Sequence, residues 1–292
     1  MKLLAKFTVI FASIFAIGLA VVGYVAHNFL EQNARVQVIQ QARLMMESAG
    51  SARTYTTNDV KPLLENQQAH MRSFLPETVP AFAATESFNY LRAKYPDYTY
   101  KEATLNPTNL RDRAVDWEAD IINSFRNRPQ NKELIGERQT PTGPSLFLAR
   151  PIAAAAPCLE CHDTPAIAPA ALIRHYGSNH GFGWKLNEIV GAQIVSVPET
   201  VPVQLAEAGF RTLMVDLGAV FLASLIILDL VIVLTISRPV SRLSRMADEI
   251  SLGRLDAPEL PVKGEDEVAV LAGSFNRMRR SLVQAMRLLE EH

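Results

Sequence analysis

Two long apolar stretches constrain this 292-residue chain more than any other feature of its sequence. Residues 7–26 carry no charge, and residues 217–237 carry only that of Asp229. Each stretch has the roughly 20 residues that an α-helix needs to cross the hydrocarbon core of a bilayer. The chain is therefore predicted to cross a membrane twice, as two transmembrane helices.

Positive charges beside these stretches predict the orientation of the chain. Lys2 and Lys6 precede the first stretch, and Arg238, Arg242 and Arg245 follow the second. Because segments rich in lysine and arginine stay in the cytoplasm, both chain ends are expected there. The first stretch is longer than the ~7 to 15 apolar residues of a cleaved signal peptide, so we expect an uncleaved anchor.

The expected boundaries divide the chain into five segments. They are a cytoplasmic N-terminus at 1–6, transmembrane helices at 7–29 and 212–237, an exported domain at 30–211, and a cytoplasmic segment at 238–292. The net charge of −1, with no basic stripe, gives no electrostatic footprint for nucleic acid, so no such partner is expected.

The exported segment mixes helical and strand-like patterns. Helices are predicted near 86–94 and 116–125, and strands near 146–150 and 189–197. Residues 30–55 contain few helix breakers, so the first transmembrane helix is expected to continue outward as a long helix. The segment is therefore predicted to be a compact α/β domain.

Apolar residues recur every three or four positions after Ser237, which is typical of a coiled-coil seam. A connector at 255–264 separates two such helices, and neither can bury its seam alone. Pairing with a second copy would close a four-helix bundle, so a homodimer is predicted. The seam residues are Val240, Leu243, Met246 and Ile250, then Val268, Leu271, Phe275, Met278, Leu282, Met286 and Leu289.

The only two cysteines lie in the sequence Cys158-Leu159-Glu160-Cys161-His162. This C-x-x-C-H pattern is typical of c-type haem attachment. The two thiols form thioether bonds to the haem vinyl groups, and the adjacent histidine becomes the proximal iron ligand. The motif also lies in the exported segment, the side on which covalent attachment takes place. One covalent haem c is therefore predicted.

Three other interpretations compete with haem attachment. With His175 and His180 the cysteines match a zinc-site spacing, but Pro165 and Pro169 interrupt the segment where a zinc finger needs a strand and a helix. A thioredoxin-like dithiol would lie at the start of a helix that follows a strand. A structural disulfide would close a loop too small to stabilise the fold much.

Further short sequence segments, spread over most of the chain, accompany the cysteine motif. They are residues 42–46 with Arg53 and Tyr55, 95–98 (Tyr-Pro-Asp-Tyr), 106–109 (Asn-Pro-Thr-Asn), 117–120 (Trp-Glu-Ala-Asp), 181–185 (Gly-Phe-Gly-Trp-Lys) and 195–198 (Val-Ser-Val-Pro). Together with the cysteine motif they resemble the exported c-type haem-binding sensor domains of PAS-like fold, which are often coupled to HAMP linkers and histidine kinases.

The C-terminal part resembles a HAMP linker. Pro239 opens its first helix, and Asp266-Glu267 opens the second, ahead of Leu271, Phe275, Asn276 and Met278. The resemblance implies an α/β, PAS-like periplasmic haem domain between two transmembrane helices, followed by an all-α HAMP coiled coil. It places the chain in a bacterial cytoplasmic (inner) membrane, with the haem domain in the periplasm.

Members of this family can use a cysteine as distal iron ligand, and this chain has no third cysteine. Met46 is the favoured substitute, because it lies seven residues from Arg53 on one helical face and Arg53 could meet a haem propionate. Core packing is the other role expected of such a methionine. The alternatives for the distal position are Met45, His70, His175, His180 and an open or water-filled site.

Asp229 lies near the middle of the second apolar stretch, where a charge is costly. We expect it to face the helix bundle and to form a hydrogen bond across the dimer.

Three functions are consistent with these features. A sensor, in which haem redox state or a bound gas shifts the helices, is favoured because an electron carrier has no use for a HAMP linker. The others are a membrane-anchored monohaem electron-transfer subunit and a small-molecule receptor with structural haem. Because no catalytic motif is present, we expect no enzyme activity and a separate output partner, such as a cytoplasmic kinase or a chemotaxis-type protein.

Overall fold

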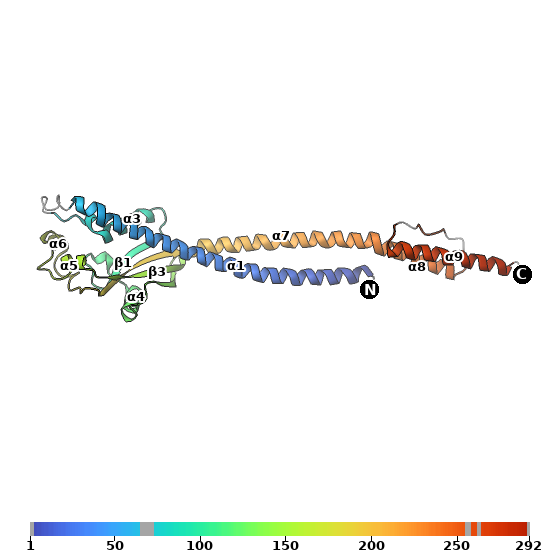
Figure 1. The fold of residues 1–292 in the computed structure, drawn as a ribbon, viewed down its shortest axis with the longest axis horizontal. Coiled ribbons are helices and arrows are strands. Elements are labelled where there is room, and N and C mark those ends of the chain that lie inside the picture. The colour runs from blue at the N-terminus through green and yellow to red at the C-terminus, as the bar shows by residue number, and fades with distance from the viewer. Residues whose placement is uncertain (1–2, 65–72, 255–257, 262–263, 291–292) are drawn as a thin grey trace. The chain divides into compact units, whose positions relative to one another are not determined.

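The computed structural model describes residues 3–64, 73–254, 258–261 and 264–290, which fall into two compact units (Figure 1). One unit, Asn28–Ala208, contains the cysteine motif. The other is formed by the described residues before Asn28 and after Ala208.

The unit Asn28–Ala208 is built on a four-stranded antiparallel sheet in the order β1-β4-β3-β2. Strand β4 is paired on both edges, which is why its backbone lies at the centre of the domain. Strands β2 and β3 form a hairpin that closes at Thr140 and Gly143. The strands are β1 (Thr99–Thr104), β2 (Leu134–Thr140), β3 (Gly143–Ala153) and β4 (Ile189–Pro198).

Helices cover both faces of the sheet, so alternate residues of the central strands enter two separate cores. Helices α1 (Leu3–Tyr55) and α3 (Pro80–Arg92) pack on one face, and α4 (Asp116–Asn127) packs on the other (Figure 1). The first core contains Val38, Ala42, Met46, Ala49, Ala84, Phe88, Tyr100, Leu146, Leu148, Val195 and Val197. The second contains Ala103, Ile121, Ile122, Phe125, Ala149, Ala192 and Ile194.

The segments that hold the cysteine motif are short and lie between these larger elements. Helices α5 (Ala156–His162) and α6 (Ala170–Tyr176) separate β3 from β4. The 3₁₀ turn η3 (Leu110–Asp112) follows β1, and η2 (Pro76–Thr78) precedes α3. The motif thus lies in the long connection between β3 and β4, which are paired central strands.

The predicted helix at 116–125 and the strands at 146–150 and 189–197 are confirmed, with β3 longer than expected. The helix expected at 86–94 begins earlier, at Pro80, where a proline is favourable in the first turn. Strands β1 and β2 were not predicted. Both are edge strands that contain charged residues, so they lack the apolar alternation that identifies a strand.

Helix α1 is a single helix of 53 residues and confirms the predicted outward continuation of the first apolar stretch. A π-helical turn, η1 (Thr56–Val60), follows it. Within the sheet-containing unit, α1 buries the face formed by Val38, Ala42, Met46 and Ala49, each at most 2% exposed. These residues are three or four positions apart, as one helical face requires.

In the other unit, the start of α1 packs antiparallel to α7 (Thr200–Ile232). The rings of Phe15 and Phe221 stack at 5.2 Å, and those of His27 and Phe210 meet at 5.4 Å. Two helical stretches, Leu4–Leu64 and Pro202–Ser251, are long and apolar enough to cross a membrane by length and composition.

Asp229 faces the neighbouring helix, as expected. The Thr8 hydroxyl lies 2.9 and 3.0 Å from its two carboxylate oxygens, a hydrogen bond within the chain that the sequence did not indicate. Thr8 is two residues from Lys6, so this register places Asp229 beside the charged end of the first apolar stretch and not near the middle of a crossing. The hydrogen bond across a dimer stays a prediction.

A π-helical turn, η4 (Val233–Ser237), joins α7 to α8 (Arg238–Ser251). Pro239 has no N–H to bond the carbonyl four residues earlier, which accounts for a wider turn at this point. Helix α9 (Glu267–Glu290) begins after Asp266, whose carboxylate accepts a hydrogen bond from the Ala269 N–H at 2.8 Å. The predicted starts of both helices are confirmed.

Helices α8 and α9 pack through small and apolar residues. Leu243 and Met246 are buried on α8, as are Ala269 and Ala272 on α9. The side chain of Asn276 accepts from the Leu260 N–H at 3.0 Å and donates to its carbonyl at 2.9 Å, which ties the connector to α9. Four predicted seam residues of α9 remain 44–55% exposed within the single chain, namely Leu271, Met278, Leu282 and Met286.

Candidate functional site

The cysteine motif lies on α5, which begins three residues after β3 ends and has Pro157 in its first turn. Cys158 and Cys161 are free thiols of intermediate exposure. Their spacing of three places both on one side of a single helical turn. Two accessible thiols on one side of a helix, followed by a histidine, suit a planar group that is attached at two points.

His162 is held by a hydrogen bond that determines which ring nitrogen carries the hydrogen. Its Nδ1 lies 2.7 Å from the backbone carbonyl oxygen of Gly181 and 3.3 Å from Oγ1 of Thr108. A carbonyl can only accept, so Nδ1 must donate. In the neutral ring Nε2 then has a free lone pair, which is the state required of a metal ligand.

Trp184 fixes the plane of this imidazole. The two rings stack with centroids 4.0 Å apart and an angle of 9° between their planes. The backbone supports the same arrangement, because the Trp184 N–H donates to the His162 carbonyl at 3.2 Å and the Gly183 N–H donates to that of Asp163 at 2.7 Å. The segment 181–184 therefore covers the end of α5.

Burial shapes the protonation of these groups. It lowers the pKa of His162, although the hydrogen bond to Gly181 opposes this effect, so the neutral imidazole is favoured. Burial and the neighbouring Glu160 raise the pKa of the Cys161 thiol, while Lys61 opposes them. A neutral imidazole suits iron ligation.

Arg53 lies close enough to the motif to interact electrostatically with Cys158. Its guanidinium donates to Glu102, which is only 5% exposed, and the Tyr100 hydroxyl donates to the same carboxylate at 2.7 Å. Burial by itself would lower the pKa of Arg53, but the Glu102 carboxylate outweighs it and the pKa is raised. The side chain that we predicted for a propionate is thus held by a buried carboxylate, which no sequence pattern indicated.

Met46 lies in the first core, where it is 2% exposed, in the same cluster as Phe88 and Tyr100. The structure therefore favours the packing role that the sequence left open for this methionine. Met45 is half-buried against the same core.

Two of the candidate histidines lie within the described residues, His175 on α6 and His180 beside Gly181. His175 is exposed on α6 and its ring is 5.9 Å from that of Phe74, and His180 directly precedes Gly181. His70 lies outside the described residues. Across the parts of the chain that the structure describes, no group of three or more His, Cys, Asp or Glu residues is arranged to hold a metal ion, so the zinc spacing has no matching geometry.

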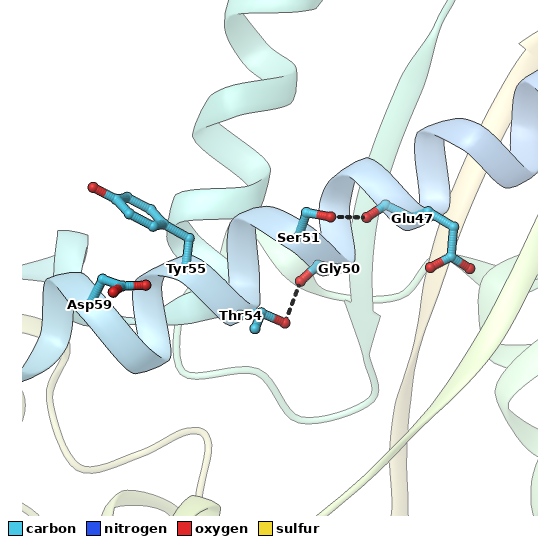
Figure 2. Close-up of a pocket in the computed structure, with 6 residues that line it drawn as sticks. All are labelled: Glu47, Gly50, Ser51, Thr54, Tyr55 and Asp59. Atoms are coloured by element: carbon cyan, nitrogen blue, oxygen red, sulfur yellow. Dashed lines mark hydrogen bonds between the residues drawn. The ribbon is translucent and has the colours of Figure 1, made fainter.

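Helix α5 begins three residues after β3 ends, so the motif also has the strand-then-helix order of a thioredoxin-like dithiol. A surface hollow of about 500 Å³ is lined mostly by polar residues of α1 and η1, and none of its lining residues belongs to α5 (Figure 2). It is lined by Glu47, Gly50, Ser51, Thr54, Tyr55 and Asp59.

Fold and site together define a protein with two membrane-type helices and an α/β domain that presents a C-x-x-C-H motif with its histidine ready to bind a metal. The Tll0287-like family matches residues 31–198, which is more than half of the chain. The chain therefore belongs to the Tll0287-like family of haem proteins. A HAMP domain matches residues 231–284.

Two individual proteins are similar to parts of the chain. The structure described as the crystal structure of the cyanobacterial heme-protein Tll0287 is 16% identical, with a TM-score of 0.37, and the match covers 57% of this chain and 94% of that one. The sensor histidine kinase MtrB of Mycolicibacterium paratuberculosis (strain ATCC BAA-968 / K-10) is 40% identical over 81 residues. That match covers 28% of this chain, which spans 14% of the kinase. The family and HAMP matches point to a membrane signal-transduction protein.

The core position of Met46 leads to a first prediction. Met46→Leu keeps an apolar side chain of similar volume, so it should cost less than about 1.5 kcal/mol in the free energy of unfolding. It should also leave the oxidised and reduced absorption spectra of the haem unchanged. Met46→Ala should cost roughly 2–5 kcal/mol, because it leaves a cavity. Loss of the low-spin spectrum in Met46→Leu would instead restore Met46 as the distal ligand.

A second prediction concerns Asp112 on η3. Burial raises the pKa of this carboxyl to about 6, with Glu102 adding to the shift and Arg111 opposing it. The folded protein therefore keeps a proton that the unfolded chain releases near its ordinary pKa of 3.8, so this group makes the fold less stable as pH rises from about 4 to 6.

Asp112→Asn removes this effect. Relative to the parent, the variant should gain stability between pH 4 and 6 and keep a constant difference above that range. Urea unfolding of the detergent-solubilised chain, followed by tryptophan fluorescence, measures it, with the exposed Asp120→Asn as control. A parent-to-variant difference that does not change with pH would contradict the assignment.

Proposed function

We propose that this chain is a sensor of the bacterial inner membrane in which one haem c controls the packing of its HAMP helices. Cys158 and Cys161 would hold the haem through thioether bonds, and His162 would be the proximal ligand through Nε2. The observation that carries the proposal is the hydrogen bond from His162 Nδ1 to the Gly181 carbonyl, because it leaves Nε2 free beside two free thiols. When bound, the haem would supply an iron that changes redox state or binds a gas.

The same proposal places residues 30–211 in the periplasm as a PAS-like domain, between crossings at 7–29 and 212–237. Lysine and arginine are concentrated before the first apolar stretch and after the second, which supports this orientation. An antiparallel sheet covered by helices on both faces supports the domain type.

A homodimer through the HAMP helices is part of the proposal. Within one chain α8 and α9 bury Leu243 and Met246, but the α9 residues Leu271, Met278 and Leu282 stay exposed to solvent. Exposed apolar residues at heptad-like spacing are stabilised by packing against another helix. A cytoplasmic kinase or chemotaxis-type protein is the proposed output partner, which the partial match to a sensor histidine kinase supports.

Signalling would run along α1. Arg53 near the end of this helix and Lys61 just beyond η1 lie close to the cysteine motif. Because α1 is unbroken from Leu3 to Tyr55, a shift at the motif can pass along one helix into the first apolar stretch. An electron-transfer subunit would not require the HAMP helices, so their presence favours the sensor.

Haem attachment provides the third prediction. Thioether bonds survive unfolding while coordination does not, so the denatured protein should stain for haem in a gel. Cys158→Ala/Cys161→Ala should lose the stain completely. His162→Ala should keep covalent haem but change the absorption spectrum of the parent, because the proximal ligand is lost.

Two results would contradict the proposal. A stain that persists in the double cysteine variant would show that the haem is attached elsewhere. A parent protein that never stains, with two thiols that form a reversible disulfide, would replace the haem by the dithiol interpretation.

A further inference from the structure

The partner of His162 is itself held by a second segment of the chain. Asn106 accepts a hydrogen bond from the Gly181 N–H at 3.1 Å and donates to the Phe182 carbonyl at 3.2 Å. One side chain thus bonds both peptide groups that flank the carbonyl to which His162 donates. Asn106 is exposed, so these two bonds, and not core packing, are its contribution to the structure.

The two segments are in contact at the level of the backbone. Gly181 has φ +82°, and a Cβ there would lie 2.0 Å from Thr108 Oγ1 and 2.8 Å from its backbone atoms. Only glycine fits such a contact and adopts this φ without strain. Thr108 in turn places its hydroxyl 3.3 Å from His162 Nδ1, as a second polar neighbour of the same nitrogen.

We propose that Asn106 is a positioning residue for the proximal histidine and that it acts through the Gly181 carbonyl. This inference rests on the proposed function, because it assigns a role to the residues behind the iron ligand. The Asn-Pro-Thr-Asn segment then has a role in the site: Asn106 fixes the peptide groups beside the acceptor, and Thr108 packs closely against Gly181.

The physical consequence of this positioning is a change in the basicity of the iron ligand and so in the midpoint potential of the haem. A hydrogen bond from the Nδ1–H of a ligating histidine makes its other nitrogen a stronger base, which stabilises the more highly charged oxidised iron. Second-shell hydrogen bonding is one of the means by which a protein sets a haem potential. When Asn106 is lost, the Gly181 carbonyl is free to turn away, and the midpoint potential should rise.

The experiment uses the detergent-solubilised full chain with its haem attached. Asn106→Ala removes both bonds. Asn109→Ala is the matched control, because it lies in the same segment and its side chain accepts from the Arg111 N–H at 3.2 Å, within its own turn. The readouts are the midpoint potential and the solvent exchange of the His162 Nδ1–H. The second is followed by NMR of ¹⁵N-histidine-labelled reduced protein under carbon monoxide.

Asn106→Ala should stain for haem like the parent, raise the potential and speed Nδ1–H exchange about fivefold to tenfold, which corresponds to the net value of one hydrogen bond. Asn106→Asp, which keeps the acceptor for the Gly181 N–H, should show a smaller change in both. Asn109→Ala should match the parent.

An Asn106→Ala protein that keeps the parent potential and exchange rate would overturn this inference and leave the proposed function intact. If that variant does not fold, Asn106→Asp replaces it, because it removes only the bond to the Phe182 carbonyl. A smaller shift of potential and exchange rate in the same direction would then support the inference, and no shift would overturn it. Absence of covalent haem in the parent would instead refute the proposed function.

Discussion

The hydrogen bond between His162 Nδ1 and the Gly181 carbonyl is the interaction on which the rest of the site depends. It joins α5 to a segment nineteen residues further along, and it determines the tautomer of the only ring that directly follows the two cysteines. Without it the imidazole could rotate and present either nitrogen. With it, and with Trp184 stacked on one face, the ring has one orientation and one free nitrogen.

The sheet provides the rigid support for this arrangement. Strands β3 and β4 are paired neighbours, and the excursion that carries α5 begins and ends on them. Strand β1 pairs with β4 on the other side and leads into the segment containing Asn106 and Thr108. Three strands therefore bring the motif, the covering segment and the bracing segment together. The segments that carry the site therefore begin or end on paired strands, which limits how far these segments can move relative to one another.

The pair formed by Arg53 and Glu102 links the motif to the long helix. Glu102 is buried on β1, and an unpaired carboxylate there would be costly, so Arg53 of α1 is required as its counter-ion. The same guanidinium lies near Cys158. Through its bond to Glu102 of β1, Arg53 thus holds the end of α1 close to the cysteine motif.

Much of this could be predicted from the sequence, because the signals are local. The apolar stretches, the C-x-x-C-H motif and the starts of α8 and α9 depend on residues that are near one another in the chain. The contacts of Asn106 with Gly181 and of Arg53 with Glu102 join distant residues, and no spacing rule indicates them. The stacking of Trp184 on His162 also joins residues that are distant in the chain, and Asp229 was expected near the middle of a crossing because sequence does not give helix register.

The central claim is that the state of the iron reaches the HAMP helices, and cysteine crosslinking tests it most directly. Leu271→Cys places a thiol on the exposed α9 seam, and Val270→Cys, one position away and also exposed, is the control. If both native thiols are bound to haem as proposed, the introduced cysteine is the only reactive one. The account predicts that crosslinking at Leu271 proceeds at different rates in oxidised and reduced protein, or with and without carbon monoxide. Equal rates at Leu271 in all of these states would contradict it.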